Sequence, residues 1–566
     1  MKQLFCSLKE NPVIKYAIIL LFFFLIGPRF IFVAEDLPYY SIDENDVVEF
    51  ALGYFDGNLN PYWFKYGAFY SYLLAFFYYV NSFFVSTSID EFIESYFFNP
   101  TTFYLTGRIF NSIIHVFLGI ISFNITHKFI SKKAAPYVLF IALIPFADTL
   151  TNYKIRVDSL LAFTNILVLY YLFSLIKVKK PKYYILLGIF IGVGLGVKTL
   201  PGFLIMPTVL LGVLISDIAR NELNNQKFNL FKLVLYQFID FKNYLLLLSI
   251  LLGFFVSHPF AFLEFDDFFN EQKNTFIADS SSDFTSGSEL ALLSNPLGLQ
   301  FILALIFVLI YGFIDSIKRK KWVIFPLIFF VLSFWLAFAR GASREYFYIP
   351  ILPVASILLG YYLHTFLKKF LLDEKMKSSI GIVVIILIAV TPLKVASGKY
   401  DNFDYKTFQN KKSTKELAEE WILSKVVPGS KILYYGYYTS LPRLIDPNPQ
   451  EQAKYGDYFM YQRWNNKYLV DRFSNFMVNY SKNGLPTYDL IYQVNVSKNS
   501  GNQSYYTRYE MGEDEQFLLS SARQAGAEYI VTSYNLEQYP EFQKLRVWSS
   551  MGKSNFGGDI NIYKIQ

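Results

Sequence analysis

The sequence predicts an α-helical protein that crosses a membrane many times and ends in a small α/β domain outside the membrane. Of its 566 residues, 53% are hydrophobic and only 17% are charged, and the mean hydropathy is +0.30. Soluble domains carry about a quarter charged residues, so this composition indicates that lipid is the main solvent. Long apolar segments recur up to about residue 395, and a mixed polar pattern follows them.

Eleven apolar segments are long enough to be membrane spans. The first has a basic flank, Lys2, Lys9 and Lys15, and no small-residue cleavage site after it, so we expect it to remain as a signal anchor. The segments are residues 13–34, 105–126, 134–150, 159–176, 183–198, 200–216, 243–260, 296–315, 322–339, 346–366 and 379–395. A further apolar stretch, 67–85, is assigned to interfacial helices of the first external loop, because counting it as a span would reverse every later one.

Basic residues cluster in every second connection between these spans. The clusters lie at the N-terminus and at 127–133, 177–182, 220–242, 318–321 and 368–377. By the positive-inside rule, the N-terminus is cytoplasmic and residues from about 396 onwards are outside. No eukaryotic retention signal is present, which favours a bacterial or archaeal plasma (inner) membrane. The net charge of +7 therefore indicates topology and contact with membrane lipids, and no nucleic-acid partner is expected.

This topology divides the chain into two domains. Residues 1–395 form a transmembrane domain that includes the first external loop, 35–104, and residues 396–566 form a soluble extracytoplasmic domain. In the latter, Ser413-Thr414-Lys415-Glu416 is a capping box that opens a helix. Strands are predicted at 431–435, 528–532 and 561–565, and a second helix at 515–524 that Gly526 ends. Mixed helices and strands predict an α/β fold.

Two adjacent carboxylates, Asp43 and Glu44, follow the first span on the external side. Such a pair suits a general base that deprotonates an acceptor hydroxyl, with the second carboxylate in support. The alternative is a solvated acidic loop, which is common on protein surfaces.

External cations form a second group of candidates. Lys65 lies in the segment 60–67, and Lys198 lies where two spans meet with almost no loop. A cation at headgroup depth can bind a lipid phosphate. The alternatives are snorkelling of Lys65 to ordinary headgroups and a structural anchor role for Lys198.

Further external polar residues are candidates for the lining of a cavity. Arg156 and Asp158 lie in one short loop, His258 ends the seventh span, and Arg344 precedes Glu345 between the ninth and tenth. Charges beside hydrocarbon are costly and often functional. Local ion pairing and, for His258, ordinary packing remain the alternatives. The only cysteine is Cys6, which leaves no thiolate metal site.

Several segments in this order resemble the GT-C superfamily of glycosyltransferases. They are Ile42-Asp43-Glu44, Asn60-Pro61-Tyr62-Trp63-Phe64-Lys65-Tyr66-Gly67, Gly107-Arg108, Arg156-Val157-Asp158-Ser159, Gly196-Val197-Lys198 and Arg344-Glu345-Tyr346-Phe347. The resemblance is to the branch of the protein O-mannosyltransferases and the aminoarabinose transferase of lipid A, glycosyltransferase families 39 and 83. It implies a GT-C fold and an inverting transfer from a polyprenyl- or dolichyl-phosphate sugar.

The resemblance also implies roles for single residues. Asp43 would be the base and Glu44 its support. Lys65 and Lys198 would lie near the donor phosphate, with Arg344 at the rim and Asp158 in the same external cavity. No cofactor is implied with certainty, and a divalent metal stays open.

Two departures and one rival class leave the acceptor and mechanism open. Gly67 stands where the family often has proline, and the Trp-Trp-Asp motif of transfer to asparagine is absent, so a lipid, glycan or protein could accept the sugar. The alternative to an enzyme is a carrier, a polyprenyl-phosphate or sugar flippase. A carrier should show repeats or polar residues at the membrane midplane, whereas the charged groups here gather at one face.

Overall fold

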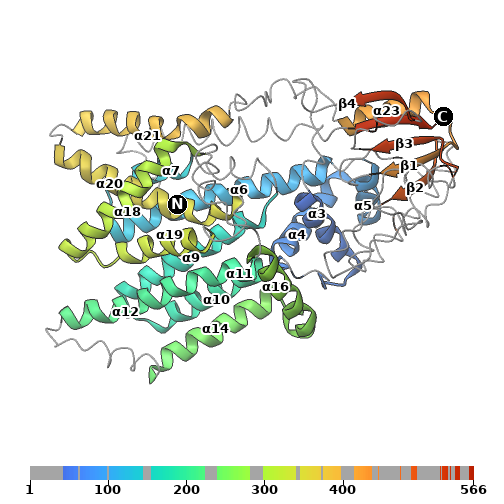
Figure 1. Ribbon diagram of the computed structural model, residues 1–566. Coiled ribbons are helices and arrows are strands. Elements are labelled where there is room, and N and C mark those ends of the chain that lie inside the picture. Colours follow the sequence, from blue (N-terminus) through green and yellow to red (C-terminus); the bar gives the residue numbers. More distant parts are fainter. Residues whose placement is uncertain are drawn as a thin grey trace. The chain divides into compact units, whose positions relative to one another are not determined.

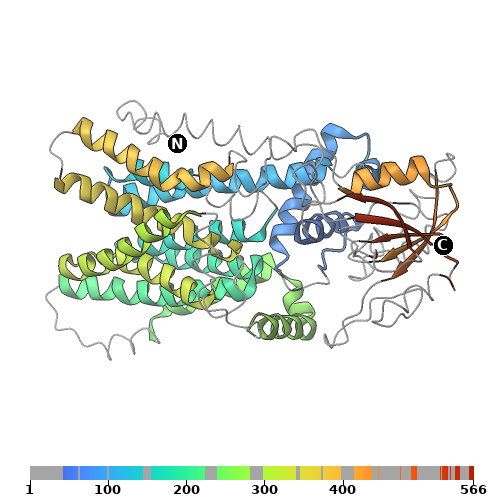
Figure 2. The same cartoon turned by 45° about the horizontal axis from the view of Figure 1, so that its top comes forward.

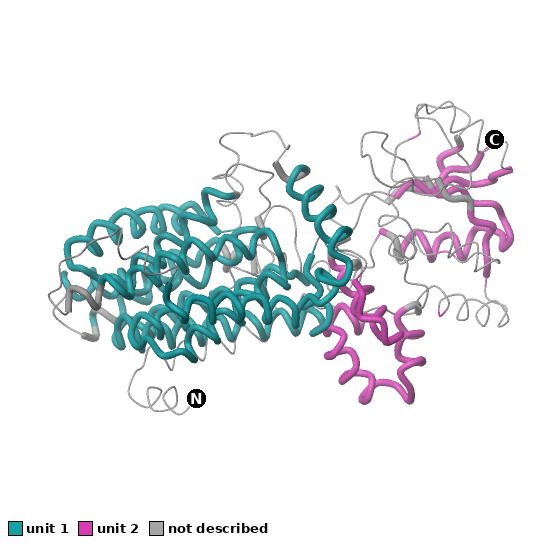
Figure 3. The backbone as a smooth tube through the Cα atoms, turned by 90° about the horizontal axis from the view of Figure 1, so that it is seen from below, with its two compact units in different colours: residues 1–31, 63–73, 107–397 teal, residues 32–62, 74–106, 398–566 magenta. Residues whose placement is uncertain are grey.

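The computed structural model describes the greater part of the chain, in two compact units (Figure 3). Unit 1 comprises residues 1–31, 63–73 and 107–397, and unit 2 comprises 32–62, 74–106 and 398–566. The described residues are 42–61, 64, 66–98, 101–144, 155–223, 239–280, 297–338, 345–370, 374–396, 414–435, 444, 472, 486–493, 523, 526–532, 536, 542–548 and 560–565.

Unit 1 is built from apolar helices (Figures 1 and 2). Its elements are most of α6 (Thr101–Ile125), the π-helical turn η2 (Thr126–Ile130), α7 (Ala135–Ala142), α9 (Val157–Lys177), α10 (Pro181–Val197), α11 (Thr199–Gly202), η3 (Phe203–Ile205), α12 (Met206–Leu223), α14 (Phe241–Ser257), α15 (Phe260–Leu263), α16 (Phe265–Ser280), α18 (Leu299–Arg319), α19 (Ile324–Phe338), η4 (Glu345–Ile351), α20 (Leu352–Phe370) and α21 (Glu374–Ala396).

The described helices confirm the predicted class of a helical membrane protein with a small C-terminal sheet. Within the described residues, five helices are long and apolar enough to cross a membrane: Thr102–Ile130, Val157–Lys177, Thr199–Ile218, Leu299–Arg319 and Phe347–Phe370. Four shorter apolar helices, Pro181–Val197, Phe241–Ser257, Ile324–Ala337 and Ser379–Thr391, lie on other predicted spans. The predicted span 13–34 and the end of 134–150 lie outside the described residues, so the count of eleven stays a prediction.

The apolar stretch 67–85 forms α4 (Phe69–Val85), which is followed by α5 (Ile89–Phe98). The two helices meet at an angle of 106°. Together they are long and apolar enough for a broken span or a re-entrant loop, so their place in the first external loop stays a prediction. Phe76, Phe83 and Phe84 are exposed on α4, as expected of a helix in contact with lipid.

Helices α10 and α14 pack against each other with almost no separation. A Cβ atom added to Gly192 would lie 2.2 Å from the carbonyl oxygen of Ile250, and one added to Gly253 would lie 2.4 Å from that of Ile189. Small residues let membrane helices approach to backbone contact. This packing holds the end of α10, where Lys198 follows, against the end of α14, where His258 follows.

Unit 2 contains α3 (Ile42–Gly53), η1 (Tyr54–Asp56), α5, and the C-terminal helix α23 (Thr414–Lys425) with five strands. The strands are β1 (Lys431–Tyr435), β2 (Asp489–Gln493), β3 (Tyr529–Thr532), β4 (Phe542–Trp548) and β5 (Ile560–Ile565), in the order β2-β1-β3-β5-β4. Strand β1 is parallel to β2 and β3, whereas β5 is antiparallel to β3 and β4.

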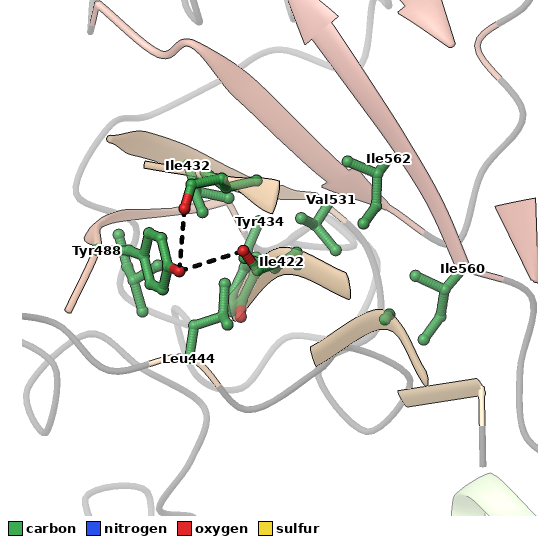
Figure 4. Packing of buried hydrophobic residues seen from close by; sticks show 11 residues of the cluster. Ile422, Ile432, Tyr434, Leu444, Tyr488, Val531, Ile560 and Ile562 are labelled. Carbon is green, nitrogen blue, oxygen red and sulfur yellow. Dashed lines mark hydrogen bonds between the residues drawn. The ribbon is translucent and has the colours of Figure 1, made fainter. Parts of the chain in front are cut away.

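The prediction of α23, β1, β3 and β5 is confirmed, and β2 and β4 were not predicted. The predicted helix at 515–524 lies outside the described residues except for Arg523, which is helical. The core is formed by apolar side chains from α23 and the sheet (Figure 4), including Ile422, Ile432, Tyr434, Val531, Ile560 and Ile562. The hydroxyl of Tyr488 donates to the carbonyl oxygens of Ile422, at 3.3 Å, and Val426, at 3.4 Å.

Candidate functional site

Lys198 lies at a break between two helices of unit 1. It follows α10 and precedes α11, and its own backbone is extended, with φ −157° and ψ 99°. The break turns its side chain to Asp158, and Lys198 Nζ donates to Asp158 Oδ1 at 2.8 Å. The side chains of Lys198 and Asp158 are only 6% and 3% exposed, so this is a buried ion pair.

Asp158 owes its position to the start of α9. It lies in the first turn of that helix, and Arg156, which precedes the helix, has an extended backbone. A carboxylate at a helix N-terminus is stabilised by the helix dipole. Arg156 is buried beside it, and the Ser159 hydroxyl lies 2.9 Å from His115 Nε2 of α6.

Aromatic rings surround the ammonium group of Lys198. Its Nζ lies 4.5 Å from the ring centre of Phe347 in η4 and 5.5 Å from that of Tyr66 in the segment before α4. Both contacts are within the range of cation–π attraction. An ammonium group held in this way is a compact point charge of the kind that binds phosphate.

The segment that contains Tyr66 is bound to the other candidate segments by main-chain contacts. Gly67 donates its N–H to the carbonyl oxygen of Val197 at 3.1 Å. A Cβ atom at Gly67 would lie 1.9 Å from the carbonyl oxygen of Gly196, so a side chain cannot be accommodated without movement. A proline at this position would lack the N–H and add that Cβ, which explains the departure from the family pattern.

His258 lies in an aromatic cluster at the end of α14. It is fully buried, and its ring centre lies 5.6 Å from that of Phe64, 5.7 Å from Phe268 and 6.0 Å from Phe254. In the part of the chain that the structure describes, neither ring nitrogen has a hydrogen-bond partner. His258 is thus packed among aromatic rings, and its predicted place in the cavity lining stays a prediction.

The remaining predicted residues are in unit 2 or outside the described residues. Asp43 and Glu44 are the second and third residues of α3, in unit 2, and Glu44 is fully buried. Lys65 and Arg344 lie outside the described residues. The structure thus brings Lys198, Asp158 and Arg156 to one end of unit 1, and the roles predicted for all these residues stay predictions.

Three buried polar residues on α6 lie on one helical face, and of these the sequence analysis named only Arg108, within the Gly107-Arg108 segment. Arg108, Asn111 and His115 are buried on an apolar helix, and Asn111 Oδ1 accepts a hydrogen bond from the Tyr70 hydroxyl at 2.8 Å. The detectable signal was their spacing of three and four residues, which places them on one helical face. Buried polar groups inside membrane helices are costly and often functional.

Among the described residues, no group of three or more His, Cys, Asp or Glu side chains is arranged to hold a metal ion.

Comparison with known proteins gives one sequence match and several similar folds. A family model described as dolichyl-phosphate-mannose-protein mannosyltransferase matches residues 103–241. ArnT from Cupriavidus metallidurans bound to undecaprenyl phosphate is a similar solved structure, with a TM-score of 0.48 and 11% identity over 96% of this chain and 97% of that chain. The apo oligosaccharyltransferase of Archaeoglobus fulgidus has a TM-score of 0.47 and 12% identity over 90% and 69% of the two chains.

A third structure, archaeal oligosaccharyltransferase AglB from Archaeoglobus fulgidus in complex with an inhibitory peptide and a dolichol-phosphate, has a TM-score of 0.45 and 12% identity, with the same coverage of 90% and 69%. None of the curated proteins matches the chain in sequence. The family match covers the helices that carry Asp158 and Lys198. The predicted resemblance to membrane glycosyltransferases is confirmed over residues 103–241, which match the family model described as dolichyl-phosphate-mannose-protein mannosyltransferase.

Proposed function

We propose that the chain transfers a sugar from a polyprenyl- or dolichyl-phosphate donor to a hydroxyl group of a lipid, glycan or protein acceptor, with inversion at the anomeric carbon. The observation that carries this proposal is the buried Lys198 ammonium, which is paired with Asp158 and flanked by two aromatic rings. It lies inside the region that matches a family described by a dolichyl-phosphate sugar donor. A cation beside hydrocarbon suits the phosphate of a lipid-linked sugar.

The proposed mechanism needs a base and a stabilised leaving group. Asp43 removes the proton of the acceptor hydroxyl, and the oxygen attacks the anomeric carbon from the face opposite the phosphate. The bond between that carbon and the phosphate oxygen breaks, and the lipid phosphate leaves with the negative charge. Lys65, Lys198 and Arg344 are proposed to stabilise this charge, and Glu44 to support Asp43.

The proposed reaction takes place on the extracytoplasmic side of a plasma (inner) membrane. The basic clusters between spans support a cytoplasmic N-terminus and an external C-terminal domain from residue 396. On this topology Asp43, Lys65 and Lys198 are all on the outer side.

The test is a pair of carboxylate variants in a purified transfer assay. Asp43→Asn keeps the shape and removes the base, so turnover should fall by about 100-fold or more while donor binding stays nearly intact. Glu44→Gln should cost less. If Asp43→Asn retains most of the activity and Asp158→Asn abolishes it, the base is Asp158 and the proposed role of Asp43 is wrong.

A further inference from the structure

Two side chains of helix α16 form hydrogen bonds with the main chain of Phe64. The Phe64 N–H donates to Glu271 Oε2 at 2.6 Å, and the Gln272 side-chain amide donates to the Phe64 carbonyl oxygen. Phe64 is in neither a helix nor a strand, so its polar backbone groups are satisfied by side chains more than 200 residues away in the sequence. Hydrogen bonds to a carboxylate are among the stronger ones, which favours a specific position over loose contact.

The side chain of Phe64 is anchored by the same helix. It is 2% exposed and packs with Ala261 of α15 and Phe268 of α16 in one buried cluster. Its ring meets that of Phe268 edge to face, with centres 6.0 Å apart. Main chain and side chain of Phe64 are therefore both held by the region between α14 and α18.

The anchored segment leads directly to Lys198. Gly67 is bound to Val197, the residue before Lys198, and Tyr66 lies against the Lys198 ammonium. Only two residues, Lys65 and Tyr66, separate the anchor at Phe64 from the anchor at Gly67. The position of Phe64 is therefore linked over a very short length of chain to the position of Gly67, which is bound to Val197.

We propose that Glu271 and Gln272 are positioning residues for the donor-phosphate site: α16 holds Phe64, and thereby sets the place of Tyr66 beside Lys198. This inference rests on the proposed function for the identity of the ligand. The hydrogen bonds that hold Phe64 are independent of it. Neither residue is assigned contact with the donor. Their role is to hold the segment that makes such contact.

The donor and acceptor roles in these two hydrogen bonds predict which substitutions preserve them. Residue 271 must accept a hydrogen bond, and residue 272 must donate one. Glu271→Gln keeps an accepting oxygen, whereas Glu271→Ala does not. Gln272→Glu keeps the size but places an acceptor against the Phe64 carbonyl oxygen. Asn274 is exposed on the same helix, so Asn274→Asp is a matched control that adds the same charge without touching Phe64.

The first experiment measures binding of undecaprenyl phosphate to the full-length protein in lipid nanodiscs. Misplaced binding groups weaken binding strongly, so we expect Gln272→Glu and Glu271→Ala to raise Kd by about tenfold or more. Glu271→Gln and Asn274→Asp should stay near the wild-type value. Equal Kd values for all variants, or an equal loss in Asn274→Asp, would overturn the positioning role.

The second experiment reads the segment directly and needs no ligand. Because Cys6 is the only cysteine, Cys6→Ser gives a background in which Lys65→Cys can carry a single spin label. Gln272→Glu and Glu271→Ala should make that label more mobile, whereas Glu271→Gln and Asn274→Asp should not. An unchanged spin-label spectrum in Gln272→Glu and Glu271→Ala would show that these two residues do not hold the segment. If wild-type protein binds no undecaprenyl phosphate, the proposed function fails. The mobility of the spin label still tests whether Glu271 and Gln272 hold the segment.

Discussion

Substitutions in the ion pair between Lys198 and Asp158 can distinguish effects on protein stability from effects on donor binding. At 2.8 Å, the attraction between two unit charges is about 6 kcal/mol at an effective dielectric constant of about 20. Desolvation of both groups offsets much of this, but removal of one partner leaves the other charge buried, which costs about 3–5 kcal/mol. We therefore expect Lys198→Met to lower the free energy of unfolding by that amount.

The double variant Asp158→Asn, Lys198→Met distinguishes the two effects. Neither member of the pair is then left as a buried charge without the other, so the double variant should regain most of the stability that Lys198→Met loses. It should not regain affinity for undecaprenyl phosphate, because the proposed phosphate-binding cation is absent. Lys179→Met is the matched control, since Lys179 forms another buried ion pair, with Asp217. It should lower stability and leave donor affinity unchanged.

Both quantities can be measured on purified protein, stability by denaturant unfolding and affinity by titration with the lipid phosphate. A loss of less than about 1 kcal/mol in Lys198→Met would show that the pair behaves as an exposed one. Equal loss of donor affinity in Lys179→Met would show that binding follows stability, and the assignment of Lys198 to the phosphate would be wrong.

Three further predictions concern other parts of the chain. Gly67→Ala places a Cβ atom 1.9 Å from the Gly196 carbonyl oxygen, and such overpacking should cost about 1–3 kcal/mol and weaken donor binding, as unfolding and titration would show. Tyr488→Phe loses its hydrogen bonds to Ile422 and Val426 and should destabilise the C-terminal domain by about 1 kcal/mol in denaturant unfolding; no change would mean that water replaces them. A reporter fused after Gln566 should be active outside the cell, and a cytoplasmic reading would contradict the proposed topology.

Local patterns of the sequence were enough for the class of fold. A run of apolar residues long enough to cross a bilayer is a property of consecutive residues, and so is the capping pattern before α23. The strands at β1, β3 and β5 follow from short apolar runs bounded by turn residues such as Gly429 and Gly526, which both have positive φ. Strands β2 and β4 were missed because neither shows a strong apolar signal: β2 has only three apolar residues, between Asp489 and Gln493, and β4 carries exposed polar residues.

Local sequence patterns predicted only part of the candidate site. Lys198, Asp158 and Arg156 stood out because charges beside apolar spans are unusual, and the structure places Lys198 and Asp158 in one ion pair. The sequence could not say whether Lys198 was paired. It also gave no reason to single out Glu271 and Gln272, which resemble any polar residues on an exposed helix.

The sequence by itself determined a helical membrane protein and a resemblance to glycosyltransferases over part of the chain, because hydrophobicity and short motifs are properties of neighbouring residues. Only the tertiary structure decided which of those residues meet. The contacts of Phe64 with Glu271 and Gln272, and of Gly67 with Val197, join segments more than 100 residues apart. They involve backbone groups that every residue carries, so no local pattern distinguishes them.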